Sequence, residues 1–260
     1  MAGVPTARGR RWFLETIAGK VPEVTLLFWA IKVLSTTVGE TGADYLAVHV
    51  GLGAGLTMAI MMLCLAAAIA MQVRQRRLVP WLYWVTVVLV SVVGTQITDV
   101  LTDRLGVSLY VSTAVFAAAL MALFIVWYRV ERTVSINEIV TRRREAFYWG
   151  AILLTFALGT AAGDLATEAL GLGFTVGSMV FVAMIAVIAI AWRAGLNAVL
   201  CFWIAYILTR PLGASVGDLL AQAREYGGMG LGTSATSVAF LAVISILVAW
   251  STLRQPRRTA

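Results

Sequence analysis

Four aspartates in this sequence each follow a tryptophan at the same distance. Asp44, Asp99, Asp164 and Asp218 come fifteen residues after a Trp, and a Gly stands ten residues after the same Trp. The Trp and Gly residues are Trp29 and Gly39, Trp84 and Gly94, Trp149 and Gly159, and Trp203 and Gly213. The chain has five Asp and nine Trp, so four matches to (Phe/Tyr)-Trp-x9-Gly-x4-Asp indicate an internal repeat. Repeated carboxylates of this kind can bind cations or carry protons.

Further polar residues extend each Asp into a column on one helix face, because residues four apart stack on a helix. The columns are Lys32, Thr36, Glu40 and Asp44; Ser91, Thr95, Asp99 and Asp103; Thr160, Asp164 and Glu168; and Arg210, Ala214, Asp218 and Gln222. The other faces carry mostly Leu, Val, Ile, Ala and Trp. A charge at a membrane centre costs about 2.5–3.5 kcal/mol, so these columns are expected to line a shared interior and not to face lipid.

Carboxylates with hydroxyls form a hard-oxygen environment, which suits protons, alkali ions, Mg²⁺ or Mn²⁺. The predicted ion-binding residues are Glu40, Asp44, Asp99, Asp164, Asp218, Thr36, Thr95 and Thr160. Of these, Glu40 and Asp44 are the best metal-ligand candidates. Lys32 and Arg210 are expected to act as charge counterparts, and Asp103 and Glu168 to lie at the outer mouth. A zinc or thiol site is not expected, since the chain has two Cys and one His.

Structural interpretations remain open beside these assignments. Each Asp could cap a short helical turn after a helix break. Lys32 and Arg210 could instead form an interhelical charge lock with Glu40 or an Asp that fixes the bundle. The repeated Trp residues are expected to pack rather than to stack on a ligand.

The elements that position these residues are hydrophobic segments. The chain has 260 residues, of which 60% are hydrophobic and 13% charged, with a mean hydropathy of +0.89, which excludes a water-soluble globule. Eight apolar runs are long enough to span a bilayer, at 22–48, 51–73, 80–101, 106–128, 146–167, 171–192, 196–220 and 233–253. The predicted fold is an all-α integral membrane bundle of eight transmembrane helices.

Basic residues predict the orientation of this bundle. Lys and Arg gather at the N-terminus, in every second loop and at the C-terminus, while the opposite loops carry only Arg104 and Arg224. By the positive-inside rule both termini are expected to be cytoplasmic. The net charge of +7 is then topological and does not indicate a nucleic-acid partner. Trp127, Trp192 and Trp250 precede basic residues and are expected to be interfacial anchors.

The repeat is expected to comprise two helices, used four times in parallel orientation. The predicted divisions are a basic cytoplasmic N-terminus at 1–21, repeats at 22–77, 78–132, 146–194 and 195–254, a cytoplasmic loop at 133–145 and a tail at 255–260. The first unit, KVPEVTLLFWAIKVLSTTVGETGADYL at residues 20–46, resembles the signature of a bacterial inner-membrane family. That family is defined by tandem copies, usually four, of domain of unknown function 347. The resemblance implies a multi-span protein of the bacterial inner membrane and no particular activity.

The sequence thus predicts a transporter or exporter of a small hard cation, through an acidic vestibule lined by the odd-numbered helices. The lipid bilayer and that cation are the expected partners, and a homo-oligomer is left open. An organic-anion transporter using Lys32 and Arg210, and a structural or sensor protein, are the alternatives. No enzymatic activity or cofactor is expected, because no nucleophile–base pair, metal-binding motif or nucleotide loop is present.

Overall fold

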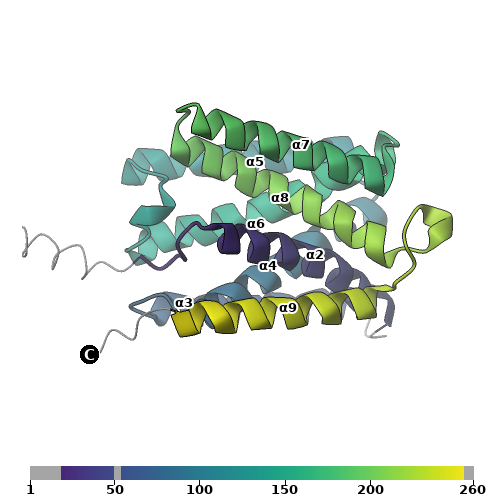
Figure 1. Ribbon diagram of the computed structural model, residues 1–260, viewed down its shortest axis with the longest axis horizontal. Coiled ribbons are helices and arrows are strands. Elements are labelled where there is room, and N and C mark those ends of the chain that lie inside the picture. The colour runs from purple at the N-terminus through teal and green to yellow at the C-terminus, as the bar shows by residue number, and fades with distance from the viewer. Residues whose placement is uncertain (1–18, 50–53, 255–260) are drawn as a thin grey trace, which may run out of the picture.

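The computed structural model describes residues 19–49 and 54–254, and within this part every regular element is helical (Figure 1). Its long helices are α2 (Leu26–His49), α3 (Ala54–Arg74), α4 (Pro80–Asp99), α5 (Leu109–Glu131), α6 (Arg142–Asp164), α7 (Gly173–Arg193), α8 (Ala198–Ala221) and α9 (Thr233–Arg254). The all-α prediction is confirmed. Residues 1–18 and 255–260, which hold most of the expected basic N-terminus and the tail, lie outside the described residues.

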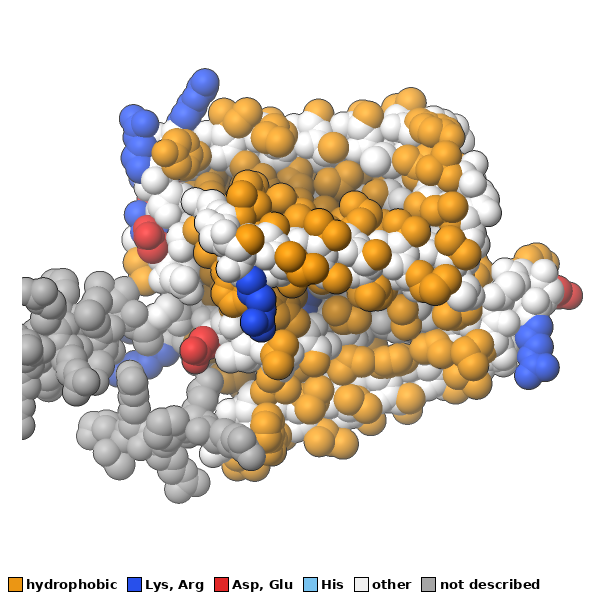
Figure 2. Space-filling view, turned by 45° about the horizontal axis from the view of Figure 1, so that its top comes forward, with side chains coloured by type: hydrophobic (Ala, Val, Ile, Leu, Met, Phe, Trp, Pro, Cys, Tyr) orange, Lys and Arg blue, Asp and Glu red, His pale blue; other side chains and the backbone are white. Residues whose placement is uncertain are grey.

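Seven of these eight helices are long and apolar enough to cross a membrane, which indicates a multi-pass membrane protein. The exception is α2, which carries Lys32, Glu40 and Asp44. Figure 2 shows hydrophobic side chains over most of the visible lateral surface, with charged side chains mainly toward its ends. Trp192 and Trp250 are exposed on this surface. The prediction that Trp127 is an interfacial anchor is wrong, because it is 1% exposed and its ring stacks between Phe124 and Phe147.

The helices form an inner and an outer set. In the apolar stretch of each helix, 56–61% of residues are buried for α4, α6 and α8, against 17–22% for α3, α5, α7 and α9. The inner helices form a closed ring, in which α2 packs on α4, α4 on α6, α6 on α8 and α8 on α2. Figure 1 shows the outer helices α3, α7 and α9 flanking this ring. The first, third, fifth and seventh apolar segments of the sequence, which are α2, α4, α6 and α8, therefore surround one axis.

Each outer helix packs chiefly on the inner helix of the next repeat. Thus α3 packs on α4, α5 on α6 and α7 on α8, and the last helix, α9, packs on α2. The Ser237 hydroxyl hydrogen-bonds to that of Thr41 (2.7 Å) and ties α9 to α2. This exchange of outer helices links the four repeats into one closed unit.

The repeated aromatic residues follow the same cycle. The aromatic residue before each Trp contacts the Trp of the next repeat, in the pairs Phe28–Trp84, Tyr83–Trp149, Tyr148–Trp203 and Phe202–Trp29, with ring centroids 5.5, 5.6, 6.2 and 5.6 Å apart. The hydroxyls of Tyr83 and Tyr148 are 2.6 Å apart and hydrogen-bonded. These tilted pairs each stabilise the bundle by about 0.5–1.5 kcal/mol beyond their burial. The aromatic repeat is accounted for by packing between neighbouring repeats.

The repeated glycines allow the inner helices to approach closely. A Cβ added to each would collide with the next inner helix: Gly39 with Ser91, Gly94 with Phe156, Gly159 with Arg210 and Gly213 with Thr36. The partner residue stands seven residues after its own Trp in all four cases. The glycine spacing is therefore a helix-contact signal, repeated around the ring.

Replacing Gly94 with alanine is expected to lower the free energy of unfolding by about 1–3 kcal/mol, the usual cost of overpacking. The new Cβ would lie 2.8 Å from Phe156 Cβ and 3.3 Å from the backbone nitrogen of Ala157, and a backbone yields little. Gly55→Ala is the matched control, because nothing lies within 4 Å of the Cβ added there. Thermal unfolding in detergent measures both. Equal midpoints for the two variants would contradict the close contact.

One end of the ring is called the basic end below, because the arginine-rich connection between α5 and α6 lies there. This connection covers the end. Ile136 and Ile139 are buried in the same core cluster as the aromatic pairs, and Trp203 Nε1 donates to the Val134 carbonyl (2.9 Å). Lys20 Nζ forms an ion pair with the buried Glu145 (2.5 Å), and the Lys20 amide donates to the Ile139 carbonyl (3.2 Å). This end of the bundle is therefore closed by packed side chains.

Candidate functional site

A cavity of about 410 Å³ lies at the other end of the inner ring. All four repeated Asp residues line it, together with three further acids, the basic Arg104 and several neutral or apolar side chains. The acids are Glu40, Asp44, Asp99, Asp103, Asp164, Glu168 and Asp218. Every repeat thus contributes at least one carboxylate to a single cavity.

The acids lie at three depths along the axis. Glu40 is deepest, with 6% exposure, and the four repeated aspartates form the next level, at which Asp218 is 8% exposed. Asp44, Asp99 and Asp164 are half-buried, while Asp103 and Glu168 are exposed at the mouth. Successive levels are four residues apart on a helix, which corresponds to about 6 Å.

Most of these carboxylates have no partner of their own. Among the described residues, the side chains of Asp99, Asp164, Glu168 and Asp218 form no hydrogen bond or ion pair. Asp44 accepts a long bond from Gln222 Nε2 (3.4 Å), and Asp103 accepts one from the Thr102 hydroxyl (3.1 Å). Crowded carboxylates without partners repel one another, so cations or protons in the cavity would stabilise them.

Two of the Asp residues are followed at once by a π-helical turn: Asp99 by η1 (Val100–Arg104) and Asp164 by η3 (Leu165–Ala169). Each π-helical turn carries the mouth acid of its column, Asp103 or Glu168. Such turns often occur at functional sites. Neither Asp99 nor Asp164 makes a side-chain capping bond, so the capping interpretation is wrong for both.

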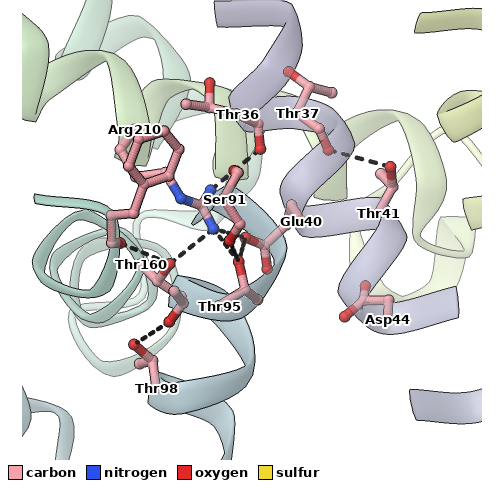
Figure 3. A network of polar contacts seen from close by, with 12 residues as sticks. Thr36, Thr37, Glu40, Thr41, Asp44, Ser91, Thr95, Thr98, Thr160 and Arg210 are labelled. Atoms are coloured by element: carbon pink, nitrogen blue, oxygen red, sulfur yellow. Dashed lines mark hydrogen bonds and ion pairs between the residues drawn. The ribbon is translucent and has the colours of Figure 1, made fainter. Parts of the chain in front are cut away.

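Arg210 forms the floor of the cavity (Figure 3). Its guanidinium Nη2 pairs with Glu40 Oε2 (2.7 Å) and donates to the hydroxyls of Thr160 (2.8 Å) and Thr95. Its Nη1 donates to the Thr36 carbonyl (3.4 Å). The fourth column has only Ala214 at the level of Glu40, Thr95 and Thr160, which leaves room for the arginine. One side chain thereby bonds to the other three inner helices.

Lys32 lies below this floor and is fully buried. Its ammonium donates to the Thr209 hydroxyl (3.1 Å) and lies 4.4 and 4.3 Å from the ring centroids of Phe156 and Tyr206. It forms no ion pair with a carboxylate of the described residues. The charge-lock interpretation therefore describes Arg210 and Glu40, and Lys32 takes no part in that pair.

The predicted site residues thus occupy two layers. The acids line the cavity, whereas Thr36, Thr95 and Thr160 lie beneath it and surround Arg210. Sequence reasoning did not include Gln96 or Arg104, which also line the cavity. Gln96 was missed because it lies one residue off the column of fours, and Arg104 because it was assigned to a loop. A polar residue beside a column in an otherwise apolar helix was the available signal for Gln96.

No group of three or more His, Cys, Asp or Glu residues in the described part of the chain is close enough to hold a metal ion. The suggested metal ligands also differ in their surroundings, since Glu40 Oε2 is bonded to Arg210 and Asp44 is bonded to Gln222. The cavity is consequently a dispersed arrangement of charges along the axis.

The comparisons with known proteins agree with the internal repeat. A family-wide sequence model described as Repeat of Unknown Function (DUF347) matches four stretches of the chain, at residues 27–78, 82–133, 147–194 and 201–256. No curated protein and no solved structure matches. The resemblance inferred from the first repeat is confirmed. Because the four matches cover most of its length, the chain belongs to the family defined by this repeat, DUF347.

Proposed function

We propose that this protein is a carrier of cations in the bacterial inner membrane, with the acidic cavity as its binding site. The observation that supports it best is the convergence of seven carboxylates on one cavity, of which only Glu40 has a basic partner among the described residues. A membrane protein keeps intramembrane charges away from lipid and uses them for substrate or ion pathways. An acidic cavity also raises the local concentration of cations.

In this proposal all eight helices cross the bilayer, including α2. Its charges do not oppose crossing, because Lys32 and Glu40 are buried inside the ring. Both termini lie in the cytoplasm, as the basic loops predict, and the cavity opens to the opposite side.

A carrier suits the geometry better than an open pore. Below the cavity the axis is filled by Arg210 with its partners and by Lys32 between aromatic rings. The aromatic pairs and the connection between α5 and α6 close the basic end. A cation could therefore pass only if this end opens while the cavity closes, as in alternating access.

The organic-anion alternative is weaker on the same geometry. Both terminal nitrogens of the Arg210 guanidinium are engaged with Glu40 and the threonines, and Lys32 is buried beneath it. An anion entering the cavity would also face the carboxylates before it reached either cation.

The test is uptake into proteoliposomes offered Rb⁺, Mn²⁺ or radiolabelled spermidine. Saturable uptake of at least one cation is expected, and Asp164→Asn should reduce it about tenfold or more, equivalent to about 1.4 kcal/mol of lost interaction. Glu225→Gln is the matched control, because Glu225 is an exposed acid outside the cavity. Absence of uptake of every cation, or equal uptake by Asp164→Asn, would contradict the proposal.

A further inference from the structure

We infer that the cavity binds a linear aliphatic polyamine and not a dehydrated metal ion. This inference rests on the cation-carrier function proposed above and names its substrate class.

The spacing of the carboxylates is the first reason. A hard metal ion such as Ca²⁺ takes about six to eight oxygens at about 2.3–2.6 Å, so its ligands must converge on one point. In the described part of the chain no three acidic side chains come close enough to do so. The acids instead occupy three levels, with Glu40 deepest, the four repeated aspartates above it, and Asp103 and Glu168 at the mouth. A cargo with several separated positive charges matches this arrangement.

The size and walls of the cavity are the second reason. Its volume of about 410 Å³ is in the range of small-molecule sites and far exceeds the roughly 30 Å³ of one water molecule. The lining also includes the apolar side chains of Val100, Leu109 and Phe174. Methylene groups of an extended amine can pack on these apolar side chains while each ammonium meets a carboxylate. The negatively polarised face of the Phe174 ring can also attract a cation.

Gln96 supplies an independent sign of a hydrogen-bonding ligand. Its side chain lines the cavity and is 7% exposed, yet its Oε1 has no hydrogen-bond partner. A buried polar atom without a partner costs about 1–3 kcal/mol, so such an atom is expected to have a partner in the loaded state. The N–H groups of an ammonium or secondary amine are donors that this oxygen can accept. Glu40 Oε1 likewise makes no bond with a described residue, since Arg210 bonds to Oε2 only.

The experiment measures binding of spermidine, Mn²⁺ and Mg²⁺ to the full-length purified protein by calorimetry and thermal shift. Spermidine is expected to bind and to raise the unfolding temperature more than either metal at equal concentration. Asp218→Asn and Gln96→Leu should each weaken spermidine binding about tenfold, the effect of one lost charge-assisted hydrogen bond. Gln75→Leu, an exposed residue outside the cavity, is the control and should bind as the parent does.

The outcomes separate this inference from the proposed function. Binding of Mn²⁺ or Mg²⁺ that depends on Asp218 and exceeds that of spermidine would overturn the polyamine assignment and leave a metal-cation carrier. Spermidine binding unchanged by both variants would overturn the assignment of the site. If no cation binds and none enters proteoliposomes, the carrier function itself is wrong. A variant that fails to fold is detected by its unfolding midpoint, and the other variant then decides.

Discussion

Replacing Arg210 with methionine is expected to lower the free energy of unfolding by about 3–5 kcal/mol, the largest loss among the substitutions considered. The substitution removes the guanidinium but leaves the Glu40 carboxylate buried, with the Thr95 hydroxyl 3.5 Å away as its remaining polar contact. An uncompensated buried charge is costlier than the ion pair it came from. The contacts to Thr160 and to the Thr36 carbonyl are lost as well. Chemical unfolding of the detergent-solubilised protein measures the change.

The double variant Arg210→Met with Glu40→Gln distinguishes a pairwise effect from general damage to the core. Removing both charges is expected to restore most of the lost stability, because well-packed neutral replacements of a buried ion pair are often close to neutral. The interaction energy of the double-mutant cycle should exceed about 2 kcal/mol, above the range for uncoupled sites. Additive losses would show that Arg210 acts through packing alone.

The pairing of Arg210 with Glu40 could be predicted only in part from the sequence. Steps of four placed Glu40 and Arg210 in columns of different repeats, and the cost of intramembrane charge predicted an interior location for both. The sequence could not select Glu40 as the partner among seven acids, since a pairing depends on the lengths and directions of side chains. Gly159 leaves space for the arginine, because a Cβ added there would lie 2.5 Å from Arg210 Cβ and Cγ, and this contact between helices is seen only once the ring is assembled.

The repeat pattern predicted the inner helices better than the outer ones. The Trp, Gly and Asp spacing lies wholly on inner helices, where backbone contact and shared charge restrict which residues fit. The outer helices have more uniform apolar faces, so their sequences do not indicate that α3 packs on α4 or that α9 returns to α2. The mistaken assignment of Trp127 has the same origin, because a Trp beside Arg129 has the sequence features of an anchor whether or not Phe147 of α6 and Trp203 of α8 pack against it.

Lys32→Met is expected to have the opposite effect on stability, raising the free energy of unfolding by about 1–2 kcal/mol. A lysine at the centre of a membrane helix costs about 2.5–3.5 kcal/mol, and its contacts with the rings of Phe156 and Tyr206 and its hydrogen bond to the Thr209 hydroxyl recover only part of that cost. Lys20→Met is the matched control, because that buried ammonium has a carboxylate partner, Glu145, and its removal should destabilise the protein. Opposite changes in the free energy of unfolding for Lys32→Met and Lys20→Met would show that a carboxylate partner decides whether a buried lysine stabilises the protein.

A charge retained at a cost in stability is expected to serve the transport cycle. In a cation carrier, a positive charge below the binding site disfavours cargo at that depth, so it hastens release toward the basic end once that end opens. Lys32→Met should therefore leave the affinity of the cavity for its cation unchanged or higher, while the rate of uptake into proteoliposomes falls about tenfold or more. Undiminished uptake by a stabilised Lys32→Met variant would mean that the ammonium has no part in transport.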